Sequence, residues 1–198
     1  MAATAILFTI ALIAVLGTVL ALAARANPTT LGQHSAKVYA SVLFKQAADY
    51  HGAFSRYVLD GGSSASMTFH SGAPTSTTEL FNTVTQYGIY QAPPPQVVIA
   101  GAAAPDWLYK GEARVPGVGS GNIGSIIFIP SLTRDACLEI NHQLYGVRTA
   151  PDSATAGAAL MATTGAVVLD TTLNGRATGC YHSTADDNYV FYATLNEA

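Results

Sequence analysis

Charged residues are scarce in this sequence. Only 11% of the 198 residues are charged, and the first 24 residues carry no charged side chain. The net charge is −3, and no basic cluster follows the uncharged stretch, so direct binding of nucleic acid is not expected. The remaining length is sufficient for one head domain with its own core.

Catalytic and metal-binding signatures are missing as well. The sequence contains no GxSxG, SxxK or HExxH pattern, and its five histidines form no HxH or i, i+4 pair. His142 and His182 follow the two cysteines and could approach each other, but two histidines alone make a poor zinc site. We therefore predict that the chain is not an enzyme and has no metal and no cofactor.

Cysteine is limited to Cys137 and Cys180. They form no CxxC motif, and no other thiol could complete a metal site with them. In an exported protein these two residues would most simply form a disulfide, which stabilises a fold by roughly 4 kcal/mol in the chain-entropy model. The alternative is two buried free thiols.

Two short motifs have both a functional and a structural interpretation. Residues 119–124 match GxGxxG, but a strand-like run ending at Pro130 follows where a dinucleotide site needs a helix, so we predict a hairpin loop. Asp186, Asp187 and Asn188 could offer oxygen ligands to calcium. They lack the spacing of a known calcium loop, and the same residues are typical of a turn before a strand.

The uncharged N-terminal stretch has three interpretations. It could be a secretory signal cleaved near Ala24-Arg25-Ala26, although no basic residue precedes it. It could be a single-pass anchor, because about 23 helical residues extend roughly 34 Å, enough to cross a hydrocarbon core of about 30 Å. It could also leave the bilayer and pack against copies of itself, a process that small residues such as Gly17 favour.

Helical periodicity dominates the first third of the chain. Pro28 predicts a kink or short break, and an apolar stripe then recurs in steps of three and four until Gly61-Gly62. We therefore expect one long helix over residues 2–60, apolar all round in its first half and amphipathic in its second. The stripe consists of Ala36, Ala40, Leu43, Ala47, Tyr50, Phe54 and Val58.

The remaining residues predict a small α+β head with an antiparallel β-sheet. Helices are expected over 77–87 and 135–145, and strands over 96–100, 107–115, 125–129, 166–169 and 189–195. The predicted domain organisation is a hydrophobic stalk helix over 1–28, an amphipathic helix over 29–60 packed on the head, and a globular head over 61–198.

This arrangement resembles that of type IV pilins and pseudopilins. The features that carry the resemblance are the uncharged N-terminal segment, Pro28, the amphipathic continuation and the late cysteine pair. The segments Ala136-Cys137-Leu138-Glu139-Ile140-Asn141, Gly179-Cys180-Tyr181 and Asn188-Tyr189-Val190-Phe191-Tyr192 are also similar to the end region of some pilin-like proteins. Thr4 and Ala5 stand where the family usually has a glutamate.

The resemblance implies a structural subunit of an extracellular helical filament, with a precursor anchored in the inner membrane. Its partners would be copies of itself, the membrane before assembly and the pilus assembly machinery. The alternative is a single-pass envelope protein that forms no long filament. Gly17 and Pro28 would mark a helix break, and the side chains packed in the filament core would be Ile6, Leu7, Phe8, Ile10, Leu12, Ile13, Val15, Leu16, Val19, Leu20 and Leu22.

Overall fold

The computed structural model describes residues 28–70, 76, 78–82, 87–102, 105–120, 124–162 and 165–196, with side chains from residue 35 onward. The chain divides into two compact units, Met1–Ser35 and Ala36–Ala198. Of the first unit, the described part is the helical backbone from residue 28 to residue 35. The account below concerns the second unit.

Helix α2 extends from Pro28 to Leu59 and supplies one layer of the core. Proline suits the first position of a helix because its missing N–H would have no intrahelical partner there. From residue 36 onward, side chains three and four positions apart are buried on one face of α2, and burying each large one contributes about 1.5–3 kcal/mol. These buried side chains are Ala40, Leu43, Ala47, Tyr50, Ala53, Phe54 and Tyr57.

The central element is a six-stranded sheet with the order β3-β5-β6-β2-β1-β4. Four of its strands form an antiparallel core, in which β6 pairs with both β5 and β2, and β2 pairs with β1. The outer strands β3 and β4 run parallel to their neighbours β5 and β1. The strand bounds are β1 Leu108–Arg114, β2 Gly124–Leu132, β3 Asp152–Ser153, β4 Val167–Val168, β5 Thr178–Ser183 and β6 Asn188–Asn196.

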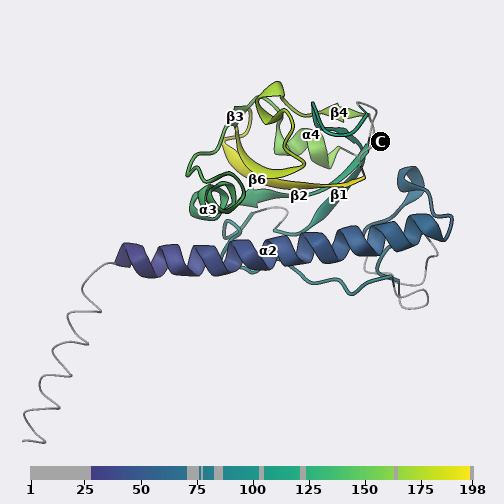
Figure 1. Ribbon diagram of the computed structural model, residues 1–198, viewed down its shortest axis with the longest axis horizontal. Coiled ribbons are helices and arrows are strands. Elements are labelled where there is room, and N and C mark those ends of the chain that lie inside the picture. Colours follow the sequence, from purple (N-terminus) through teal and green to yellow (C-terminus); the bar gives the residue numbers. More distant parts are fainter. Residues whose placement is uncertain are drawn as a thin grey trace, which may run out of the picture. The chain divides into compact units, whose positions relative to one another are not determined.

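The sheet curls between helices on its two sides (Figure 1). On one side α2 packs on side chains of β2 and β6 together with helix α3, Arg134–Tyr145. On the other side the short helix α4, Gly157–Met161, contributes Leu160 to a second apolar cluster. The central strands are therefore covered on both faces, and their sequences show little alternation between polar and apolar residues. Two single-turn 3-10 helices, η1 Ser64–Ser66 and η2 Thr171–Leu173, complete the secondary structure of the described residues.

The prediction of an antiparallel sheet is wrong, because the sheet contains both parallel and antiparallel pairs. The difference comes from β3 and β4, which are two residues long and pair in parallel. Parallel pairing needs a crossover of a dozen or more residues, and the chain supplies one in each case. Two residues are too few for a period-of-two pattern, so the direction of neither strand can be predicted, although the apolar run at 166–169 does indicate β4.

The expected helix over residues 2–60 is also wrong. The described helix begins at Pro28, and no helix within the described residues is both long and apolar enough to cross a membrane. The uncharged residues 1–24 lie outside the described part of the chain.

The local predictions for the head met with mixed outcomes. The expected strands at 107–115, 125–129, 166–169 and 189–195 correspond to β1, β2, β4 and β6, and the expected helix at 135–145 corresponds to α3. The helix expected over 77–87 is not found at residues 78–82, which form turns and a bridge between Thr68 and Glu79. The strand expected over 96–100 is reduced to one bridge between Val98 and Leu132. Strand β5 was not predicted.

Candidate functional site

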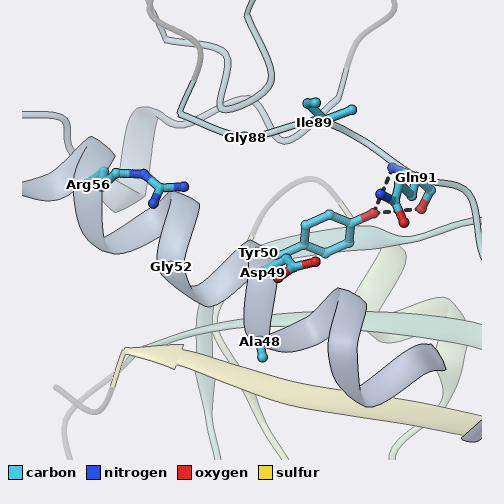
Figure 2. Close-up of a pocket in the computed structure, with 8 residues that line it drawn as sticks. All are labelled: Ala48, Asp49, Tyr50, Gly52, Arg56, Gly88, Ile89 and Gln91. Atoms are coloured by element: carbon cyan, nitrogen blue, oxygen red, sulfur yellow. Dashed lines mark hydrogen bonds between the residues drawn. The ribbon is translucent and has the colours of Figure 1, made fainter. Parts of the chain in front are cut away.

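A hollow of about 350 Å³ lies between α2 and the extended segment 87–91 (Figure 2). A second hollow of about 540 Å³ adjoins it and shares three lining residues, Arg56, Gly88 and Ile89. The Ile89 side chain is 82% exposed and extends away from α2. The first hollow is lined by Ala48, Asp49, Tyr50, Gly52, Arg56, Gly88, Ile89 and Gln91.

Tyr50 connects the wall of this hollow to the core. Its hydroxyl donates to the Gln91 carbonyl at 2.6 Å and accepts from the Gln91 N–H at 2.9 Å. Burial raises the pKa of Tyr50 to about 12, against the lowering effect of the Gln91 hydrogen bond. Its ring lies in edge contact with Phe69, Phe81 and Trp107, with centroids 5.0–5.5 Å apart. Tyr50 is therefore a neutral structural group near pH 7.

The charged groups of the hollow already have partners. The Arg56 guanidinium donates from two nitrogens to the Tyr87 carbonyl. Asp49 forms an ion pair with Lys45 at 2.6 Å, one helical turn away. Such an exposed i, i+4 pair contributes only about 0.3–0.5 kcal/mol. The arrangement holds segment 87–91 against α2 and contains no nucleophile with an adjacent base.

His182 forms hydrogen bonds with two carboxylates, one from each of its ring nitrogens. Its Nδ1 lies 2.9 Å from Asp152 Oδ1, and its Nε2 lies 2.9 Å from Asp187 Oδ1. These two hydrogen bonds raise the pKa of His182, because the carboxylates favour the doubly protonated ring. Asp152 belongs to β3 and Asp187 to the turn between β5 and β6, so His182 bridges two separate segments.

A second polar centre surrounds the disulfide. Cys137 of α3 and Cys180 of β5 are bonded, with Cα atoms 5.4 Å apart. Asn141, fully buried one turn after Cys137, donates to the carbonyl oxygens of Cys180 and Thr149, each at 2.8 Å. The Cys180 N–H donates back to Asn141 Oδ1 at 3.1 Å. The disulfide and the amide together join α3 to the middle of β5.

The predicted site residues fall into two groups. Cys137 and Cys180 are paired as the sequence predicts, and Pro28 is the first residue of α2. The predicted helix break concerns Gly17 and the residues just before Pro28, and these lie outside the described residues. The predicted filament-core residues also lie outside them: Ile6, Leu7, Phe8, Ile10, Leu12, Ile13, Val15, Leu16, Val19, Leu20 and Leu22.

The GxGxxG segment and the Asp-Asp-Asn segment both have a structural role in the part of the chain that the structure describes. The GxGxxG segment lies in the connection between antiparallel β1 and β2, and a strand rather than a helix follows it. Asp186 and Asp187 are engaged separately, Asp186 with the Ala158 N–H and Asp187 with His182. Within the described residues, no group of three or more His, Cys, Asp or Glu side chains is placed to hold a metal ion.

The comparisons with known proteins give no relative. No protein-family model, no curated protein and no solved structure matches this chain. Function is therefore inferred from the residues and their geometry alone.

Several polar contacts were not anticipated from the sequence. Gln46 lies on the buried face of α2, where it accepts from Trp107 Nε1 and donates to the Ala92 carbonyl, both at 3.1 Å. Buried Glu139 pairs with Arg148 at 2.5 Å. For Gln46, the sequence does show a polar residue on the apolar face of the predicted helix. That pattern indicates a buried polar contact but does not identify its partners.

Proposed function

We propose that this chain is a structural subunit that polymerises into an extracellular filament through its uncharged N-terminal segment. Lipid and neighbouring apolar segments are nearly equivalent environments for such a sequence, so moving from one to the other costs little. The proposed precursor is held in the inner membrane and delivered to the filament by assembly machinery. The proposed role is mechanical, with no catalytic step.

The observation that carries the proposal is the attachment of α2 to the head. Helix α2 extends from Pro28 to Leu59, and residues 25–27 separate it in the sequence from the uncharged residues 1–24. Between Ala40 and Tyr57 it buries seven apolar side chains in the head core. A load applied to α2 would therefore be transmitted through these side chains to the core of the head.

The contacts within the head also suit a subunit that must carry mechanical force. The disulfide joins α3 to β5, and β5 lies next to β6, which packs against α2. A short path of covalent and apolar contacts therefore connects α2 to β6, β5 and α3. The low content of charged residues suits close packing between copies, because few ions would have to be desolvated.

The test is Leu12→Asp, compared with Leu59→Asp as a matched control. Leu59 is 84% exposed at the end of α2, so the control makes the same substitution outside the segment proposed to polymerise. Filaments sheared from cells and viewed by negative-stain microscopy should disappear with Leu12→Asp and persist with Leu59→Asp. Circular dichroism of the purified proteins should show the same folded head in both.

Two outcomes would reject the proposal. Filaments at the wild-type yield from Leu12→Asp would show that the N-terminal segment does not drive polymerisation. The absence of filaments from the wild type, with the protein retained in the membrane fraction, would favour an anchored envelope protein that works without polymerising.

A further inference from the structure

Three buried side-chain oxygens have no hydrogen-bond partner among the described residues. They are the Tyr181 hydroxyl, Ser183 Oγ and Asp186 Oδ1. More than nine in ten buried polar groups in proteins have a partner, because each orphan costs about 1–3 kcal/mol. All three orphans fall between residues 181 and 186, at the end of β5 and in the turn that follows. Such clustering points to one shared partner.

Tyr181 and Ser183 direct their side chains to the same face of the sheet. They are alternate residues of β5, and alternate side chains of a strand point the same way. Tyr181 belongs to the apolar cluster that includes Leu160 of α4, whereas the intervening Cys180 belongs to the cluster on the α2 side. Both Tyr181 and Ser183 are 0% exposed, so bulk water does not reach either hydroxyl.

Asp186 brings a carboxylate to this same face. Its Oδ2 accepts from the Ala158 N–H at 3.3 Å, which holds the side chain against α4. A Cβ placed on Gly157 would lie 3.3 Å from Asp186 Oδ2 and 3.4 Å from Pro130, so glycine leaves room for the carboxylate. Burial first, and then the Asp186 charge, raise the pKa of Tyr181, as expected if the two groups are close.

We propose that one internal water molecule binds between the Tyr181 hydroxyl, Ser183 Oγ and Asp186 Oδ1. Buried waters typically make about three hydrogen bonds to otherwise unsatisfied groups. This water donates one hydrogen bond to the Asp186 carboxylate and forms one with each of the two hydroxyls. All three oxygens then have a partner. It ties the β5–β6 turn to the sheet from the inside, while His182 ties the same turn from the outside through Asp187.

The oxygen count favours water over a metal cation. Calcium takes six to eight oxygen ligands and magnesium takes near-octahedral coordination. Three side-chain oxygens, of which a single carboxylate carries charge, are too few for either ion. The same three groups match the donors and acceptors of one water molecule.

The direct test is a crystal structure of the full-length chain at a resolution that defines ordered water. A water within hydrogen-bond distance of at least two of the three oxygens is the expected result. A direct hydrogen bond between the Tyr181 hydroxyl and Asp186, with no water present, would overturn the proposal. An anomalous signal at the site after soaking in rubidium or thallium salt would also overturn it, because the ligand would then be a cation.

A second test uses the sign of a stability change. If Tyr181 binds the water, Tyr181→Phe removes a satisfied hydroxyl, and the midpoint of thermal unfolding should fall by about 2–4 °C. If the hydroxyl has no partner, the same change removes a buried polar group that destabilises the folded state. The midpoint of thermal unfolding should then stay the same or rise. The matched control is Tyr192→Phe, because the hydroxyl of this buried tyrosine on the same face donates directly to the Arg176 carbonyl at 2.9 Å. If Tyr181→Phe does not fold, Ser183→Ala gives the same distinction.

Discussion

Asn141 and Cys180 exchange two hydrogen bonds, from Asn141 Nδ2 to the Cys180 carbonyl and from the Cys180 N–H to Asn141 Oδ1. The amide side chain thereby pairs with the backbone of β5 as a neighbouring strand would. It comes from α3, next to the disulfide that joins the same two elements. The contact uses both the donor and the acceptor of the amide, whereas an ionised carboxylate would only accept and an apolar side chain would do neither.

Asn141→Ala should lower the free energy of unfolding by about 2–4 kcal/mol. The substitution leaves the N–H and carbonyl of buried Cys180 without their partner, and each buried orphan costs roughly 1–3 kcal/mol before relaxation. Asn141→Asp should be at least as damaging, because a carboxylate would face two carbonyl oxygens. Urea unfolding measures the change. His142→Ala, at the exposed neighbouring position, should stay within about 0.5 kcal/mol of the wild type.

Loss of the disulfide should destabilise the head by up to about 4 kcal/mol. Cys137 and Cys180 are separated by 43 positions, and a closed loop of this size removes much of the entropy of the unfolded chain. The measurement is the urea midpoint of the wild type with and without reductant, beside a Cys137→Ala/Cys180→Ala variant. Equal midpoints in all three samples would show that α3 and β5 do not need the bond.

Stability should depend on pH through His182. Its pKa is raised in the folded protein by Asp152 and Asp187, so the stabilisation is fully present below the unfolded histidine pKa, about 6.5. It is lost as the pH rises through the folded pKa. The free energy of unfolding of the wild type, relative to His182→Gln, should therefore fall as the pH rises above about 6.5.

Trp107 should report the docking of α2 on the sheet. It is the single tryptophan of the chain, it is 2% exposed, and its Nε1 donates to Gln46 of α2. The folded protein should emit at short wavelength and resist quenching by acrylamide. Gln46→Ala removes the partner of the indole N–H and should lower the free energy of unfolding by about 1–3 kcal/mol. A native emission spectrum like that of the unfolded chain would contradict the placement of α2.

The sequence was most informative where long apolar patterns exist. The stripe along residues 36–58 identifies the buried face of α2, and most of its members are buried. The two ends of the stripe are the exceptions: Ala36 is half-buried, and Val58 is 43% exposed because the helix ends one residue later. Strands β1, β2 and β6 are seven to nine residues long, enough for a β signal.

The sequence was least informative where tertiary contacts decide the structure. Strand β5 reads Thr-Gly-Cys-Tyr-His-Ser, which has weak strand propensity, yet it pairs with β6 and is held by the disulfide and Asn141. The bridge between His182 and two aspartates joins residues up to 30 positions apart. No spacing rule could connect them, because the contact depends on the parallel pairing of β3 with β5.

The shortness of β3 and β4 bears on how copies of the head can meet. These two-residue strands stand at the two edges of the sheet, and a long unpaired edge strand would invite another chain to add to it. The outer side of β1 next to β4 is obstructed as well, because a Cβ on Gly111 would come within 2.9 Å of the Ser64 carbonyl oxygen. In the proposed filament, the heads would therefore have little free backbone at β3 and β4 with which to form a continuous sheet. Neighbouring copies would meet through side chains, and such contacts can be broken without unfolding either partner.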